Sequence, residues 1–173
     1  MTTIRIVIAV TAVRQWSLSQ MDVKNVFLQG DLFEEVYITP PLGLPCSPGY
    51  VCKLHKALYG LKQALRAWFA KFSSVIYDLG FCASDHDSAL FLRSTSSGFI
   101  LLLLYVDDMI ITGDDNVGVQ LLKIQLQDYF EMKDLGPLQY FLGIEVSSSP
   151  KGYLLSQSKY ASDVIQRAGL TDT

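Results

Sequence analysis

The chain has 173 residues, of which 50% are hydrophobic, 12% aromatic and 18% charged, with a formal net charge of −3 at pH 7. This composition excludes an intrinsically disordered chain, and the net charge argues against nucleic-acid binding through bulk positive charge. The length suits one domain, or one domain and part of another. Because the charged fraction lies below the ~25% that is usual in soluble domains, we expect part of the surface to face another domain.

The cysteine content indicates a reduced, intracellular protein that is not secreted. Cys46, Cys52 and Cys82 include no Cys-x-x-Cys pair and are too few for a disulfide framework. Cys52 and His55 have a ligand-like spacing, but no second pair completes a zinc site. The longest apolar run, residues 99–106, has eight residues, whereas a membrane-spanning helix needs about 20. We therefore expect no membrane partner.

Charge is distributed unevenly along the chain. Residues 36–77 contain no acidic residue and five basic ones, a local charge of +5. Residues 78–115 contain seven aspartates and one arginine, a local charge of −6. A basic segment followed by an acidic one suits a protein that handles phosphate groups and holds divalent cations. Chance clustering of charges on a solvated face gives the same pattern.

The first part of the chain predicts a helix, a strand and a long loop. Residues 4–13 favour a helix, and residues 16–23 favour a strand that ends near Asp22. A turn with helical tendency follows at residues 25–32. Residues 37–48 contain four prolines, which exclude regular structure, and residues 51–54 predict a short strand.

The middle of the chain predicts a long helix and a hairpin. Apolar residues recur at helical spacing between Ala64 and Leu79, and Gly80 closes that helix. Residues 89–93 and 99–106 predict strands. The second of these is interrupted by Asp107-Asp108 and resumes at residues 109–112, which predicts a hairpin with two aspartates at its tip.

The last part of the chain predicts two helices and another hairpin. Residues 115–116 can cap a helix that Gly136-Pro137 stops. Its expected apolar face consists of Val117, Leu121, Ile124 and Tyr129. Residues 140–146 and 153–156 predict a hairpin, and residues 159–168 predict a final helix. The predicted fold class is α+β, with an antiparallel sheet covered by helices on one face.

The strongest chemical signal is the pair Asp107 and Asp108 after the apolar run of residues 100–104. Adjacent carboxylates at the end of a buried strand repel each other and cannot be satisfied by apolar neighbours, but a divalent cation removes both difficulties. Because consecutive strand residues point to opposite faces, another carboxylate must come from elsewhere, and we expect Asp22 to supply it. A solvated Asp-Asp turn is the alternative interpretation.

Five segments, in order, resemble the reverse transcriptases of copia-type LTR retrotransposons. They cover nearly the whole chain and are QMDVKNVFLQGDL (residues 20–32), LYGLKQALRAWF (58–69), YVDD (105–108), FLGIEV (141–146) and LSQSKYA (155–161). The resemblance implies an RNA-directed DNA polymerase that transfers nucleotides to a primer 3′ end with two Mg²⁺ ions, a type of chemistry that paired metals support; Mn²⁺ is a possible substitute. The implied architecture is a right-handed polymerase palm, with partial fingers at about residues 36–77 and the start of a thumb at about residues 157–173.

The same resemblance implies roles for particular residues. Asp22 and Asp107 would be the principal metal ligands, with the Val23 carbonyl completing the site and Asp108, the third catalytic carboxylate, contributing less directly. Phe27 would lie under the sugar of the incoming nucleotide and exclude a 2′-hydroxyl, although it also suits a core position. The remaining nucleotide-binding residues would be Tyr59, Gly60 and Lys62. The nucleic-acid-binding residues would be Gln63, Arg66, Tyr105, Leu142 and Gly143.

The implied partners are an RNA or DNA template with its primer, deoxynucleoside triphosphates, and the fingers, thumb and ribonuclease H segments of the same polyprotein. A cytoplasmic virus-like particle would be the location. Leu65 stands where the family usually has proline, which pre-sets the start of a helix, and we expect Met1 to fall inside the family's domain. These departures leave a second interpretation open, a truncated and inactive remnant. Another palm enzyme with two metals would explain the carboxylates but not the ordered segments.

Overall fold

The computed structural model describes residues 2–45, 47, 49–150 and 152–170 and has a mixed α/β fold with antiparallel sheets. Its main sheet has the strand order β4-β5-β6-β7-β1-β8. In that order the strands are β4 (Cys82–Ser84), β5 (Asp87–Thr95), β6 (Gly98–Tyr105), β7 (Asp108–Gly113), β1 (Ser17–Val23) and β8 (Met132–Pro137). The predicted strand at residues 16–23 and the predicted hairpin of residues 99–112 are confirmed as β1 and β6–β7.

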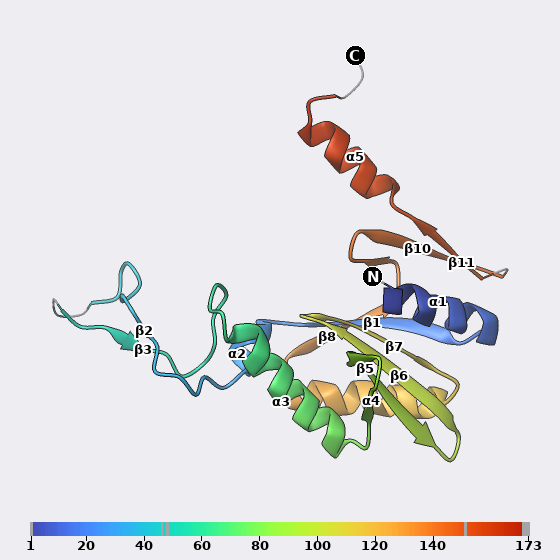
Figure 1. Cartoon of the computed structure of the whole chain (residues 1–173), viewed down its shortest axis with the longest axis horizontal. Coiled ribbons are helices and arrows are strands. Elements are labelled where there is room, and N and C mark those ends of the chain that lie inside the picture. Colours follow the sequence, from blue (N-terminus) through green and yellow to red (C-terminus); the bar gives the residue numbers. More distant parts are fainter. Residues whose placement is uncertain (1, 46, 48, 151, 171–173) are drawn as a thin grey trace.

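Two smaller antiparallel units accompany the main sheet. One consists of β9 (Tyr140–Phe141), β10 (Ile144–Ser149) and β11 (Gly152–Ser156). The other is a ribbon of β2 (Tyr37–Ile38) and β3 (Cys52–Lys53), which projects from the body in Figure 1. Strand β2 lies at the start of the region predicted to be loop, so that part of the prediction was wrong, whereas β3 confirms the short strand predicted at residues 51–54. Cys46, Pro48, Lys151 and residues 171–173 lie outside the described residues.

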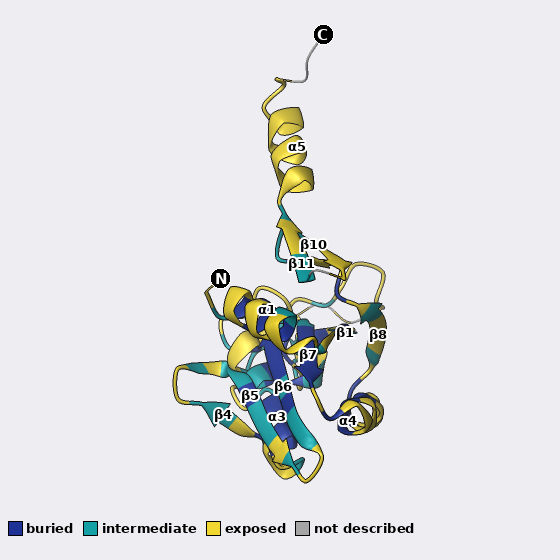
Figure 2. Cartoon of the chain, turned by 90° about the vertical axis from the view of Figure 1, so that its right-hand side faces the viewer, coloured by how far each residue is buried: buried dark blue, intermediate teal, exposed yellow. Residues whose placement is uncertain are grey.

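The helices are α1 (Thr2–Arg14), α2 (Val26–Gln29), α3 (Ala64–Asp78), α4 (Asn116–Tyr129) and α5 (Ser158–Arg167). Helices α3 and α4 lie on one side of the main sheet and α1 on the other, while α5 extends away from the body (Figure 1). No residue of α5 is buried, whereas the central strands are mostly buried in Figure 2. The predicted helices at residues 4–13, 64–79 and 159–168 are confirmed as α1, α3 and α5.

The main sheet is covered on both faces, so the expected cover on one face was wrong. On the α3–α4 face, sheet residues pack with helix residues in a core that includes Met21, Leu102, Met109, Ile111, Trp68, Phe72, Leu122 and Leu126. On the opposite face, a second core includes Ile4, Val7, Ile8, Leu18, Leu103, Ile110, Phe141 and Ile144. Consecutive residues of β6 therefore enter different cores. A continuous apolar run is typical of a strand that is buried on both faces.

Helix α4 presents the opposite face from the one predicted. The four residues of the expected apolar face are exposed in the structure: Val117, Leu121, Ile124 and Tyr129. The face that packs on the sheet contains Gly118, Val119, Leu122 and Leu126. Both sets have helical spacing, and a glycine contact decides between them. A Cβ at Gly118 would lie 2.8 Å from Ile100 Cδ1, so the missing side chain allows the helix to approach β6.

Strand β8 replaces the C-terminal part of the helix that was predicted to run to Gly136-Pro137. The helix ends at Tyr129, and β8 pairs antiparallel with β1 through a register shift between Gln20 and Met21. Sequence reasoning missed this strand because four of its six residues, Lys133, Asp134, Gly136 and Pro137, are of types that are usually depleted in strands. As an edge strand, β8 tolerates Pro137.

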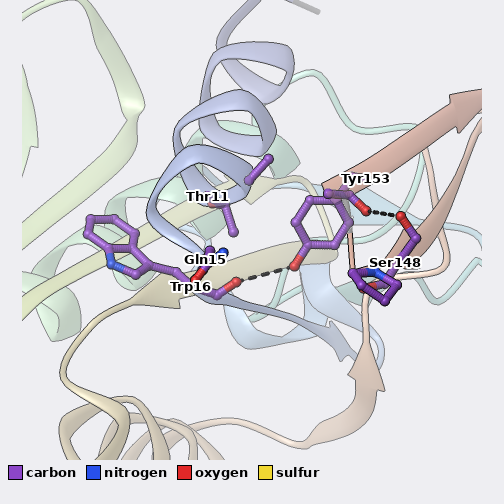
Figure 3. Close-up of a pocket in the computed structure, with 9 residues that line it drawn as sticks. Thr11, Gln15, Trp16, Ser148 and Tyr153 are labelled. Carbon is purple, nitrogen blue, oxygen red and sulfur yellow. Dashed lines mark hydrogen bonds between the residues drawn. The ribbon is translucent and has the colours of Figure 1, made fainter.

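The β10–β11 hairpin is joined to the corner between α1 and β1. The Tyr153 hydroxyl donates a hydrogen bond of 3.3 Å to the Trp16 carbonyl oxygen, and burial raises the pKa of that hydroxyl. A cavity of about 290 Å³ lies beside this contact, between the end of α1 and the hairpin (Figure 3). The hydrogen bond therefore helps to fix the hairpin against the body.

An ion pair between a buried lysine and an exposed aspartate joins α4 to β8, and it supports a prediction about stability. Lys123 Nζ lies 3.1 Å from Asp134 Oδ2, with the lysine side chain 8% exposed and the aspartate 38% exposed. We expect Asp134→Asn to lower the free energy of unfolding by about 1–3 kcal/mol, because it leaves a buried ammonium without its counter-ion. Lys123→Met should cost less, since it buries no unpaired charge. Urea unfolding of both variants checks this order.

The exposed pair Lys24–Glu131 is the matched control, since its side chains are 54% and 60% exposed. Glu131→Gln should change the free energy of unfolding by no more than about 1 kcal/mol. A larger loss in Lys123→Met than in Asp134→Asn would contradict the role given to the buried charge.

Candidate active site

The pairing of β1 with β7 brings two of the predicted carboxylates together. Asp22 is the direct cross-strand partner of Asp108. Directly opposed residues of an antiparallel pair project to the same face of the sheet. Asp107 lies in the adjoining turn, and its carbonyl oxygen accepts a hydrogen bond of 2.9 Å from the Val23 N–H. The strand ends at Asp22 and at Asp107-Asp108 are therefore side by side, although 84 residues separate Asp22 from Asp107 in sequence.

The turn between β6 and β7 has an unusual backbone. Tyr105 pairs with Asp108 across the hairpin, so Val106 and Asp107 are the two central residues of the turn. Val106 has a φ of +56°, which is a strained conformation for a β-branched residue and costs about 1–3 kcal/mol. The Val106 carbonyl oxygen accepts a hydrogen bond of 2.7 Å from the Trp68 indole.

The electrostatics of the site centre on Asp108. Burial raises the pKa of its carboxyl above the ordinary value of 3.8, and the negative charges of Asp107 and Asp22 raise it further. The Gln20 side chain opposes this shift in pKa by donating a hydrogen bond of 2.9 Å from Nε2 to Asp108 Oδ1. Sequence reasoning missed Gln20. The available signal was its position two residues before Asp22, which places both side chains on one face of β1.

The donor chemistry of the site fits a hard divalent cation. Mutually repelling carboxylate oxygens are ligands that Mg²⁺ prefers. Over the described ranges, no group of three or more histidine, cysteine, aspartate or glutamate side chains is gathered closely enough to hold a metal. Asp22, Asp107 and Asp108 are therefore not gathered into a cluster of three ligands, and neither Cys52 nor His55 belongs to such a cluster in the described residues. Mg²⁺ usually binds one or two carboxylates together with substrate phosphates, so the carboxylate pair would hold an ion with the phosphates supplying further oxygens.

The residues expected to contact the nucleotide lie in α2 and in the segment before α3. The Phe27 and Tyr59 rings meet edge to face, with centroids 4.4 Å apart, and Phe27 is also partly packed against the core. Tyr59 is exposed. Gly60 has a φ of +91° and nothing within 4 Å of an added Cβ, so its backbone conformation rather than a close contact requires glycine.

Two cavities flank the hairpin that carries the carboxylates. One, of about 550 Å³, is lined by Lys62, Arg66, Trp68, Tyr105 and Val106 among others. The other, of about 560 Å³, is lined by Gln20, Asp108, Tyr140, Leu142 and Gly143 among others. The structure thus brings most of the predicted nucleic-acid-binding residues close to the hairpin.

Three further observations concern the predicted nucleic-acid-binding residues Gln63, Leu142, Gly143 and Tyr105. Gln63 donates a hydrogen bond of 2.9 Å to Glu34 Oε1. Leu142 and Gly143 have φ values of +50° and +81°, so they form the tight turn between β9 and β10. The Tyr105 ring lies 6.4 Å from that of Phe141, which precedes this turn.

Comparison with known proteins identifies the family to which this chain belongs. Residues 1–173 match the family described as reverse transcriptase (RNA-dependent DNA polymerase), and the chain belongs to that family.

In the described part of the chain, no helix combines the length and apolar character that a bilayer crossing requires.

The relatives narrow the class to copia-type retrotransposons. The chain is 43% identical over 171 residues to the retrovirus-related Pol polyproteins from transposons RE2 and RE1 of Arabidopsis thaliana, matching 98% of this chain and 12% of each relative. It is 42% identical over 172 residues to that from transposon TNT 1-94 of Nicotiana tabacum, matching 96% of this chain and 13% of the relative. The chain thus spans about an eighth of the length of these relatives.

The raised pKa of Asp108 predicts how stability depends on pH. A carboxyl whose folded pKa is raised binds its proton more tightly in the native state, so stability falls as the pH rises from 3.8 through the folded pKa. At neutral pH without divalent cations, we expect Asp108→Asn to raise the midpoint of thermal unfolding. The difference between the unfolding midpoints of the variant and the wild type should disappear at pH values below 3.8. There the Asp108 carboxyl of the wild type is protonated in both the folded and the unfolded protein.

The matched control is Asp85→Asn, which changes an exposed aspartate between β4 and β5. Differential scanning calorimetry over a pH series measures all three proteins. An Asp108→Asn variant that is less stable than wild type at neutral pH would contradict the account of repulsion at the site.

Proposed function

We propose that the chain is the catalytic palm of an RNA-directed DNA polymerase, which adds deoxynucleotides to a primer 3′ end with two divalent cations. The observation that carries this proposal is the placement of Asp22 opposite Asp108 and beside Asp107, in a chain that matches the reverse transcriptase family throughout. In the same proposal, residues 36–77 form part of the fingers and residues 157–173 begin the thumb.

Each part of the site has a proposed task. The bound cations would lower the pKa of the primer hydroxyl and stabilise the leaving pyrophosphate oxygen. Asp22, Asp107 and the Val23 carbonyl would hold them, and Asp108 would contribute charge. Because Asp22 and Asp108 are fixed by strand pairing rather than by a loop, the carboxylates would be preorganised for the transition state.

The surroundings would orient the substrates. Lys62 and Arg66, which lie on the cavity beside Tyr105, would bind phosphates without sequence preference. Leu142 and Gly143, on the cavity beside Asp108, would contact the primer strand. Template, primer and deoxynucleoside triphosphates would thus meet at the β6–β7 hairpin, with the remaining segments of a Pol polyprotein as further partners.

A second candidate function is an inactive remnant of such a polymerase, and Leu65 favours it. Leu65 is the second residue of α3 and is 51% exposed. Its side chain therefore adds little packing where proline would stiffen the start of the helix. The activity measurement below decides between the two candidates.

Replacement of each of the three carboxylates should lower the rate of primer extension by a different amount. The chain, joined to the flanking segments of the RE1 Pol polyprotein, is assayed with primer–template, Mg²⁺ and deoxynucleotides. We expect Asp22→Asn and Asp107→Asn each to lower the extension rate about a hundredfold or more, because metal charge stabilisation is worth several kcal/mol. Asp108→Asn should lower it less. No extension by the wild-type chimera would support the remnant, and extension unaffected by Asp22→Asn would refute the site.

Phe27 should determine the choice of sugar. Replacement of its ring by a methyl group would open space for a 2′-hydroxyl, so Phe27→Ala should raise the use of ribonucleotides relative to deoxynucleotides. The ratio of kcat/KM for the two substrates in the same chimera measures this. Phe69→Ala is the matched control, since this partly buried ring also packs against the core but is not among the residues proposed to contact the nucleotide; it should leave the ratio unchanged. Loss of folding with an unchanged ratio in Phe27→Ala would show that the ring serves the core.

A further inference from the structure

The turn that carries Asp107 is held from two sides by hydrogen bonds to its carbonyl oxygens. The Val23 N–H of β1 donates to the Asp107 carbonyl at 2.9 Å. The Trp68 indole N–H of α3 donates to the Val106 carbonyl at 2.7 Å. Both central residues of the turn are therefore anchored, one to the strand that carries Asp22 and the other to a helix.

Trp68 is suited to hold a backbone conformation that the turn would not adopt readily. Its side chain is fully buried, and its ring centroid lies 5.3 Å from that of Phe72 and 5.2 Å from that of Phe130. These contacts fix the direction of the indole N–H, which is the only hydrogen-bond donor of the side chain. The acceptor belongs to Val106, whose positive φ is disfavoured for a β-branched residue.

Fixing the Val106 carbonyl fixes the peptide plane between Val106 and Asp107, because the peptide unit is planar. The orientation of that plane determines where the Asp107 backbone begins and hence where its carboxylate points. A phenylalanine at position 68 would retain aromatic packing but supply no donor. The N–H group of the indole is therefore not needed for aromatic packing. It is needed to hold the turn through the Val106 carbonyl.

We propose that Trp68 is a positioning residue, which holds the Val106–Asp107 turn in its strained conformation and thereby sets the carboxylates for cation binding. The part of this inference that concerns cations rests on the proposed function. The part that concerns the turn stands on the hydrogen bond and the backbone geometry alone.

The test uses the 173-residue chain and Mn²⁺ as the probe, with Mn²⁺ affinity measured by electron paramagnetic resonance. Trp68→Phe should weaken Mn²⁺ binding about 10- to 100-fold, the usual loss when a residue that orients metal ligands is removed. It should also shift the backbone NMR signals of Val106 and Asp107. Ile76→Ala is the matched control, because it opens a cavity in the same core about two helical turns beyond Trp68 on α3. It should lower thermal stability and leave both readouts unchanged.

A second variant separates the loss of the donor from damage to the core. Val106→Gly removes the steric penalty of the positive φ, so the turn should depend less on its anchor. Trp68→Phe introduced into Val106→Gly should therefore weaken Mn²⁺ binding by a smaller factor than it does in wild type. An equal factor in both backgrounds would overturn the proposal.

The remaining outcomes distinguish this proposal from the proposed function. Unchanged turn signals in Trp68→Phe would overturn the positioning role, whether or not Mn²⁺ binds. The absence of any Mn²⁺ binding by the wild-type chain would count against the proposed function, and the NMR signals of the turn would then decide the role of Trp68 by themselves. An Ile76→Ala variant that reproduces both effects of Trp68→Phe would show that Trp68 acts only through core packing.

Discussion

The opposition of Asp22 and Asp108 across two hydrogen-bonded strands is the constraint on which the rest of the site depends. Their alignment follows from the register of β1 on β7. A slip of one residue would turn the affected side chains to the other face of the sheet, so the register must be held firmly. Burial on both faces of the main sheet provides that hold, because Met21 enters one core while Leu18 enters the other. The two cores thus stabilise the fold and also position the carboxylates.

The placement of like charges side by side has a cost, which the surrounding structure offsets only in part. The Gln20 amide donates to Asp108, but burial and the neighbouring charges still raise the pKa of that carboxyl. A strained Val106 adds to the cost. Strained backbone conformations and perturbed pKa values cluster at active sites. Repulsion and strain at one hairpin therefore point to a function that a purely structural turn would not require.

Much of the fold follows from the sequence alone. Apolar runs, hydrophobic periodicity and glycines that end the elements predict three parts of the fold. These are the strand at residues 16–23, the hairpin around Asp107-Asp108 and the helix that begins at Ala64. These signals are local. The prediction that strand ends would meet near Asp22 also depended only on an antiparallel pairing. The family resemblance, which the match over the whole chain confirms, supplied the order of the segments.

The features that were not predicted depend on contacts between distant segments. Helix α4 has two plausible apolar faces, and the close approach of Gly118 to Ile100 selects one of them. Strand β8 is rich in residue types that strands usually lack, and it forms because β1 offers it a free edge. Trp68 belongs to the apolar pattern that predicts α3, and it is buried, but its indole also donates to a carbonyl 38 residues away. No local pattern reports such a partner.

The central claim is that the two strand ends form one cation site. The most direct measurement is the loss of backbone NMR signals on addition of substoichiometric Mn²⁺, since paramagnetic broadening depends steeply on distance from the ion. If the two strand ends form one cation site, signals from Asp22 and Val23 will disappear together with those from Asp107 and Asp108. Broadening confined to one strand, or centred on the aspartates at positions 114 and 115, would contradict it.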